Sequence, residues 1–194
     1  MITGIIMASG FSKRMVKNKL LLKIDGEMLI ERTVKTIKKS KVDEIIITYR
    51  EDFIKLIGKK YNINTVYNDS ADAGQSSSIK IGIQAASTST EGYMFFVGDQ
   101  PFLSNIIIDK LINEFNTDKS KIIIPLYGGS RGNPVIFPSS FEGELMKLEG
   151  DVGGRIIIMS NHDKVKYIDI DDSQQGEDVD TWEEYLRLID KRDK

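Results

Sequence analysis

The segment MITGIIMASGFSKRM, residues 1–15, passes from an apolar run through a turn of small residues into a basic stretch. The apolar run at residues 4–8 predicts a buried strand. Gly10 lies in the turn, and Arg14 and Lys19 are among the cations that follow it. A strand that ends in backbone donors and fixed cations is suited to holding phosphate. The segment therefore predicts a protein that handles nucleotides.

The composition narrows the class of protein. The chain has 194 residues, 40% of them hydrophobic and 29% charged, which predicts one soluble globular domain over residues 1–194. The net charge is −2, so nucleic acid is not an expected partner and phosphate binding would depend on local clusters. No apolar run approaches the roughly 18 residues of a membrane helix, and no signal-peptide pattern is present. We expect a cytoplasmic protein that makes no membrane contact.

Two residue types limit the chemistry. The chain contains no cysteine, which excludes disulfides, thiolate nucleophiles and thiolate metal sites. The single histidine, His162, lies in a polar Ser-Asn-His-Asp stretch. It is therefore expected in a loop rather than in a Ser-His-Asp triad or a histidine-rich metal site.

Short apolar runs alternate with amphipathic segments along the chain. Strands are expected at 4–8, 44–49, 63–67, 93–97, 122–124, 135–137 and 165–170. Helices are expected at 29–39, 52–60, 76–86, 141–148 and 154–159, after a cap at Ser104, and after Asp180-Thr181. The alternation predicts an α/β fold of three layers, α/β/α, with a mostly parallel sheet. The Gly- and Pro-rich residues 127–138 predict a loop and hairpin over a site.

Three polar motifs follow expected strands, at 8–10, 68–69 and 98–99, where open α/β sheets bind ligands. The first motif matches neither the Walker nor the Rossmann glycine pattern. Its small residues allow close backbone approach to a ligand. Arg14 offers a bidentate fork for phosphate, and Lys19 offers a point charge. An ordinary solvated loop with surface cations is the alternative.

Acidic residues supply a candidate metal site. Asp99 directly follows a core strand, and aspartate is a hard oxygen ligand suited to Mg²⁺. A capping or turn aspartate is the alternative. In the segment 178–181, Asp178 and Asp180 point to the same side if the backbone is extended. Asp180 could instead cap the last helix, with Glu183 three residues on.

Two further segments carry polar groups suited to a ligand. Asn68, Gln75 and Ser77 lie around the start of the helix expected at 76–86, where amides and hydroxyls can bind a base, a ribose or a phosphate. Capping by one serine is the alternative. The Gly-rich turns that contain Arg131, Asn133 and Asp151 suggest a second ligand lobe, or else surface turns.

Taken together, these motifs resemble the molybdenum cofactor cytidylyltransferase family, within the molybdopterin nucleotidyltransferases. The resemblance covers nearly the whole chain. It rests on these motifs in order: Ala8-Ser9-Gly10-x-Ser12-x-Arg14-Met15 with Lys19-Leu20-Leu21, Gly98-Asp99-Gln100-Pro101, Gly132-Asn133-Pro134-Val135, Leu148-x-Gly150-Asp151-x-Gly153 and Asp178-Val179-Asp180-Thr181. It implies a Rossmann-like, nucleotide-diphospho-sugar transferase fold. It also implies that CTP and molybdopterin cofactor are converted to the cytosine dinucleotide cofactor and pyrophosphate.

The resemblance also implies roles for residues. Asp99 and Asp180 would hold Mg²⁺, and Arg14, Lys19 and Asp99 would be catalytic. The nucleotide would be bound by Ala8, Ser9, Gly10, Arg14, Lys19, Asn68, Gln75, Ser77 and Asp99. The acceptor would be bound by Arg131, Asn133 and Asp151. An apo-molybdoenzyme or its chaperone would be a protein partner.

The choice of CTP rests on Ser9. The guanylyl branch usually has glycine at this position and the cytidylyl branch alanine. Val16 departs from the family, which usually has glycine there. The alternatives are a GTP-dependent molybdopterin guanylyltransferase, a sugar-phosphate nucleotidyltransferase, and a non-catalytic nucleotide-binding protein that delivers the cofactor.

Overall fold

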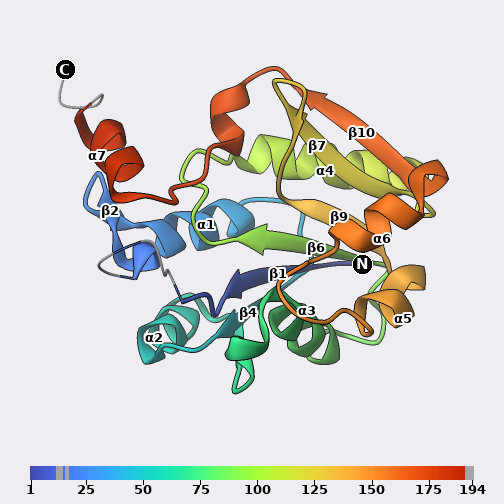
Figure 1. The fold of residues 1–194 in the computed structure, drawn as a ribbon, viewed down its shortest axis with the longest axis horizontal. Helices are drawn as coiled ribbons and strands as arrows, with labels where there is room; N and C mark the ends of the chain where they lie inside the picture. The colour runs from blue at the N-terminus through green and yellow to red at the C-terminus, as the bar shows by residue number, and fades with distance from the viewer. Residues whose placement is uncertain (12–14, 16–17, 191–194) are drawn as a thin grey trace.

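The fold is built around one twisted sheet (Figure 1). The structure is a computed structural model and describes residues 1–11, 15 and 18–190. The strands of the sheet lie in the order β10-β7-β9-β6-β1-β4-β5, and β8 pairs with β7 beside this series. The strands are β1 (Ile2–Ala8), β4 (Glu44–Tyr49), β5 (Asn64–Tyr67), β6 (Gly92–Val97), β7 (Ile122–Tyr127), β8 (Ser130–Arg131), β9 (Val135–Pro138) and β10 (Val165–Ile170).

The sheet is mostly parallel, as the alternation of elements predicts. Strand β1 pairs in parallel with both β4 and β6, and β10 pairs in parallel with β7. Strand β9 is antiparallel to both of its neighbours, and β8 is antiparallel to β7. The expected hairpin within residues 127–138 is therefore present as the β7–β8 turn.

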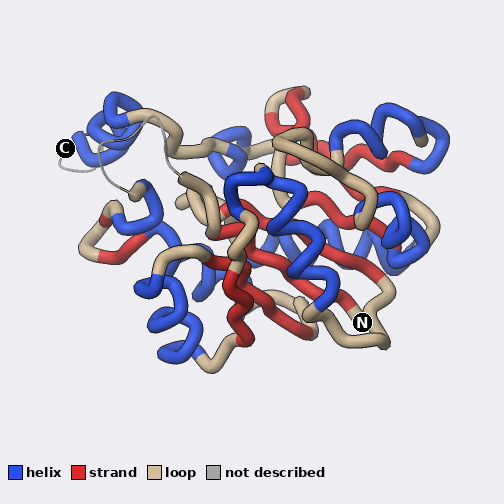
Figure 2. The backbone as a smooth tube through the Cα atoms, turned by 60° about the horizontal axis from the view of Figure 1, so that its bottom comes forward, coloured by secondary structure: helices blue, strands red, loops and turns tan. Residues whose placement is uncertain are grey.

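Helices cover both faces of the sheet, which gives the predicted three layers (Figure 2). One face packs against α1 (Leu29–Lys38), α2 (Asp52–Tyr61) and α4 (Asn105–Thr117). The other face packs against α3 (Gln75–Gln84), α5 (Glu142–Leu145) and α6 (Arg155–Ser160). The neighbours Ile5 and Ile6 of β1 point into opposite cores, as the two-residue period of a strand requires. Ser104 caps α4, as its sequence predicts.

A small third core joins residues 22–29 to residues 179–188 near the C-terminal end of the described chain. It packs the hairpin β2 (Lys23–Ile24) and β3 (Glu27–Met28), which the sequence patterns do not reveal, against α7 (Trp182–Asp190). Its buried members are Leu22, Ile24, Leu29, Val179 and Leu188. Figure 1 shows α7 next to β2, on the side where β1 and β6 end. No described helix is long and apolar enough to cross a membrane.

Candidate functional site

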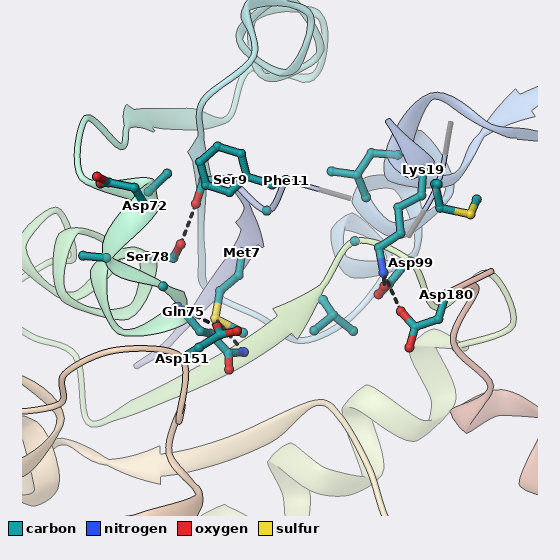
Figure 3. Close-up of a pocket in the computed structure, with 18 of the residues that line it drawn as sticks. Met7, Ser9, Phe11, Lys19, Asp72, Gln75, Ser78, Asp99, Asp151 and Asp180 are labelled. Atoms are coloured by element: carbon teal, nitrogen blue, oxygen red, sulfur yellow. Dashed lines mark hydrogen bonds and ion pairs between the residues drawn. The ribbon is translucent and has the colours of Figure 1, made fainter. Parts of the chain in front are cut away.

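A cavity of about 940 Å³ opens where β1 and β6 end at the carboxyl edge of the sheet. Parallel strands bring these ends together, which is where ligands bind in open α/β sheets. The cavity has two contrasting sides (Figure 3). Its lining comprises Met7, Ser9, Gly10, Phe11, Met15, Lys19, Leu20, Ala71, Asp72, Ala73, Gly74, Gln75, Ser78, Val97, Gly98, Asp99, Gly150, Asp151 and Asp180.

One side is charged. The ammonium group of Lys19, in the 3₁₀ turn Lys19–Leu21, lies between two carboxylates from distant parts of the chain. It forms an ion pair with Asp99 directly after β6, and its Nζ lies 2.8 Å from Oδ1 of Asp180. Asp178 precedes Asp180 by two residues, and the charges of Asp99 and Asp180 both act on it. We call Lys19, Asp99, Asp178 and Asp180 the acidic cluster.

The segment before α7 is held in place by Val179. Its side chain is fully buried in the third core, and its N–H donates to the carbonyl of Asp99 at 3.0 Å. Because residues alternate along extended backbone, Asp178 and Asp180 flank this anchor. The pairing of the segment with the end of β6 therefore brings the aspartates of the two motifs together.

Asp180 is not the cap of the last helix. The hydroxyl of Thr181 accepts from the N–H of Glu184 at 3.2 Å. The Glu184 carboxylate in turn accepts from the N–H groups of Asp180 and Thr181 at 2.8 and 2.9 Å. This is a capping box built on Thr181 and Glu184 rather than on Asp180 and Glu183. The carboxylate of Asp180 therefore faces Lys19.

Charge and burial shift the pKa values of two groups in the acidic cluster. Burial alone would lower the pKa of Lys19, but the charges and hydrogen bonds of Asp99 and Asp180 outweigh it and raise the pKa. Although Asp178 is exposed as a residue, desolvation of its carboxyl group, together with the negative charges of Asp99 and Asp180, raises the pKa of Asp178 to about 7. The cluster concentrates negative charge that a cation would relieve.

The cluster also contains an oxygen without a hydrogen bond. Oδ1 of Asp99 is buried and has no hydrogen-bond partner among the described residues. Such an atom is costly unless something else binds it. No group of three or more Asp, Glu, His or Cys side chains in the described part of the chain is arranged to hold a metal ion by itself. An ion at Asp99 and Asp180 would thus take further ligands from solvent or substrate, as Mg²⁺ usually does.

The opposite side carries neutral polar groups together with the carboxylates of Asp72 and Asp151 (Figure 3). The Nδ2 group of the buried Asn68 lies 2.8 Å from the hydroxyl of Ser77, 3.0 Å from that of Ser9 and 3.2 Å from that of Ser78. The Ser9 and Ser78 hydroxyls are also 2.5 Å apart. We call these four residues the amide–hydroxyl network. It joins the ends of β1 and β5 to the first turn of α3.

A glycine contact joins the start of α3 to the loop 148–155. Gly74 has φ +88°, and a Cβ atom there would lie 2.6 Å from the backbone of Gly150. The N–H of Gln75 donates to Oδ1 of Asp151 at 3.1 Å, and that of Ser76 to the carbonyl of Gly150 at 3.2 Å. Asp151, expected on the acceptor side, therefore shares a cavity wall with Gln75.

The structure separates the expected site residues into three groups. Ser9, Gly10, Lys19, Gln75, Asp99, Asp151 and Asp180 line the cavity. Ala8, Asn68 and Ser77 are buried behind its surface. Arg131 and Asn133 lie away from it: the guanidinium of Arg131 stacks on Tyr167 and the carbonyl of Asn133 accepts from Tyr127. Arg14 and Val16 lie outside the described residues.

Sequence reasoning missed several lining residues. Ser78 stands in the polar helix start but was not assigned a role, and Phe11 is an aromatic residue in the first loop. Phe11 is 43% exposed, and the guanidinium carbon of Arg50 lies 4.3 Å from its ring centre. An aromatic residue directly after the small residues Ser9 and Gly10 was the available signal.

Comparisons with known proteins identify the family of the chain. Residues 4–165 match the family described as the MobA-like NTP transferase domain. The purine catabolism protein PucB of Bacillus subtilis is 28% identical over 94% of this chain and 93% of its own length. A probable molybdenum cofactor guanylyltransferase of Natranaerobius thermophilus is 33% identical over 66% of this chain and 62% of its own length. The crystal structure of Rv0371c from Mycobacterium tuberculosis in complex with manganese has a TM-score of 0.81 at 24% identity, covering 97% of this chain and 98% of that one.

Proposed function

This chain belongs to the MobA-like NTP transferase domain family, and we propose that it transfers CMP from CTP to molybdopterin cofactor. The products are the cytosine dinucleotide cofactor and pyrophosphate. One observation carries the proposal: Lys19, Asp99 and Asp180, from three distant segments, meet on one side of a cavity whose other side carries the amide–hydroxyl network. A large cavity with a cation on one side and neutral amide and hydroxyl groups on the other suits a nucleotide, which has a triphosphate at one end and a base at the other.

The chemistry fits a site without a nucleophilic side chain. A terminal phosphate oxygen of the acceptor attacks the α-phosphorus of CTP, and the bond to the bridging oxygen of pyrophosphate breaks. Two anions must approach each other, so the protein has to position them and neutralise their charge. Lys19 supplies a positive charge at the phosphates, and the backbone at Ser9 and Gly10 permits close approach. Arg14 would add a second cation.

Asp99 and Asp180 would hold a divalent cation, for which we propose Mg²⁺. The buried, unpartnered Oδ1 of Asp99 and the hard oxygen donors of both residues fit such an ion. When bound, the ion supplies charge stabilisation at the phosphates. The manganese complex of Rv0371c supports the same class of ion.

The remaining expected residues differ in their position relative to the cavity. Gln75 and Asp151 lie in the cavity and are proposed to contact the ligands, Gln75 on the nucleotide side. Asn68 and Ser77 are proposed to act on the nucleotide from behind the cavity surface. Ala8 is proposed to act on the nucleotide through its backbone, at the end of β1. Arg131 and Asn133 stay proposals for the acceptor side.

GTP is the second candidate nucleotide. The relative from Natranaerobius thermophilus, which is named a probable guanylyltransferase, favours it. Ser9 favours CTP, because a side chain stands where the guanylyl branch usually has glycine. A receiving molybdoenzyme, or its chaperone, would be the partner of the product in either case.

Pyrophosphate release tests the proposal. The protein is incubated with Mg²⁺ and molybdopterin cofactor, and with CTP or GTP in separate reactions. Release with CTP, absent without cofactor and abolished by a metal chelator, is the expected result. If pyrophosphate is released with GTP but not with CTP, GTP is the nucleotide substrate. If it is released only when a sugar 1-phosphate takes the place of molybdopterin cofactor, the acceptor is a sugar phosphate. Nucleotide binding by calorimetry without any release would favour a delivery protein over an enzyme.

A further inference from the structure

The amide–hydroxyl network has a defined direction. The side chain of Asn68 is 1% exposed, and its Oδ1 accepts from the backbone N–H of Ser70 at 3.2 Å. A backbone N–H can only donate, so the amide oxygen must face Ser70. The NH₂ group therefore faces the hydroxyls of Ser9, Ser77 and Ser78. The amide nitrogen can donate hydrogen bonds but cannot accept them, so the hydroxyl oxygens of all three serines act as acceptors toward it.

The hydroxyl protons can then be counted. Ser77 donates its proton to the carbonyl of Gly74 at 2.8 Å. Ser9 and Ser78 share one hydrogen bond, which uses one of their two protons. Within the described chain, their other recorded partner is the Asn68 NH₂ group, which cannot accept. One proton of the pair is left over, and both side chains line the cavity.

We propose that Asn68 is a positioning residue that makes the Ser9–Ser78 pair present one hydroxyl donor to the bound nucleotide. The proposal rests on the proposed function and assigns a hydrogen-bond donor to this side of the site. The matching ligand atom is a hydrogen-bond acceptor of the nucleoside, such as the carbonyl oxygen that cytosine and guanine both carry. Either serine can donate to its partner, so either can deliver the remaining proton.

This sharing predicts a distinctive pattern of mutant affinities. The variants Ser9→Ala, Ser78→Ala and the double variant are compared with the wild type by calorimetric titration with CTP and GTP. Each single variant keeps one hydroxyl that can donate, so its Kd should rise about twofold. The double variant loses the donor, so its Kd should rise about tenfold, more than the product of the single effects. Ser76→Ala is the matched control, because Ser76 is in the same helical turn but its hydroxyl donates to the carbonyl of Ala73 instead of joining the network.

Reversing the polarity of Asn68 tests its own role. In Asn68→Asp the side chain offers acceptors only, so it attracts the protons of both Ser9 and Ser78. The cavity loses its donor although both hydroxyls remain, and affinity should fall about tenfold. Adding Ser9→Ala and Ser78→Ala to this variant should then cause no further loss. A mere charge effect on the nucleotide would leave that further tenfold loss intact. Melting temperatures show which variants are folded.

Two results would overturn the inference. One is a double variant that binds nucleotide as tightly as the wild type. The other is additive losses, in which the two single effects multiply to give the double effect. Failure of the proposed function looks different, because the wild type itself would then bind neither CTP nor GTP.

Discussion

The amide–hydroxyl network and the acidic cluster face each other across one cavity, yet their polar atoms are satisfied in different ways. In the network, one amide links three hydroxyls, and the hydrogen bonds lie between groups of the protein itself. In the cluster, Asp99 and Asp180 flank Lys19, and Oδ1 of Asp99 is buried without a hydrogen bond. The network is built to keep its shape without ligand. The cluster retains unsatisfied charge that ligand can use. Variants on the two sides should therefore differ in kind.

The largest effect is expected on turnover, from Asp99→Ala. Removing the buried carboxylate should lower the rate of pyrophosphate release at least about 100-fold, because transition-state charge stabilisation is worth a few kcal/mol. Steady-state assays with saturating nucleotide measure it. Asp171→Ala, which removes an exposed carboxylate on the surface, is the matched control. Near-normal turnover of the Asp99 variant would show that the acidic cluster takes no part in the reaction.

The next effect is expected on stability, from Asn68→Ala in the amide–hydroxyl network. Three hydroxyls would lose their shared donor in a buried setting, so the free energy of unfolding should fall by about 2 kcal/mol. Urea unfolding without ligand measures the change. Asn64→Ala, at an exposed position of the adjacent strand, should change it by less than about 0.5 kcal/mol. Equal effects of the two variants would mean that the network does not stabilise the fold.

Gly98→Ala tests how tightly the acidic cluster is packed from below. A Cβ atom at Gly98 would lie 2.8 Å from a methyl group of Leu20, the neighbour of Lys19. Overpacking should lower the free energy of unfolding by about 1.5 kcal/mol. Gly143→Ala is the matched control with the opposite sign. Nothing lies within 4 Å of an added Cβ there, and alanine in a helix should stabilise by about 0.5–1 kcal/mol. Stabilisation by Gly98→Ala would show that Leu20 has room to move.

The smallest effect is expected from Lys19→Met in the absence of nucleotide. Lys19 is a cation between Asp99 and Asp180, so it opposes the binding of a second cation there. Its removal should tighten the binding of Mn²⁺ about fivefold, as expected for one charge a few ångströms away in a solvated site. Calorimetry with the metal alone measures this, and Lys23→Met, an exposed lysine of β2, controls for net charge. Unchanged or weaker Mn²⁺ binding would contradict the assignment of the carboxylates to a metal.

The sequence predicted most of the scaffold. The segments 44–49 and 165–170 coincide with β4 and β10, because both are rich in β-branched residues, which favour strands. The hairpin β2–β3 was missed, since each of its strands has only two residues and no period can be recognised. The antiparallel direction of β9 was also missed, because a short strand between two prolines has the same pattern in either direction.

The site was predictable where a residue sits directly at a strand end, as Asp99 does. The cap at Thr181 was readable too, since Thr181 and Glu184 have the spacing of a capping box. The position of Asn68 behind the cavity was not readable. It depends on tertiary contacts with Ser9 and Ser78, which lie on other elements. The separation of Arg131 from the cavity likewise depends on how the β7–β8 turn packs, which no local pattern encodes.

The anchoring of Val179 has a consequence for how the protein folds during its synthesis on the ribosome. Synthesis runs from the N-terminus, so β1, β6 and the amide–hydroxyl network are made before the segment 178–180. A nascent chain that ends before this segment lacks both Asp180 and the Val179 side chain of the third core. Only chains extended beyond Asp180 can hold both carboxylates against Lys19.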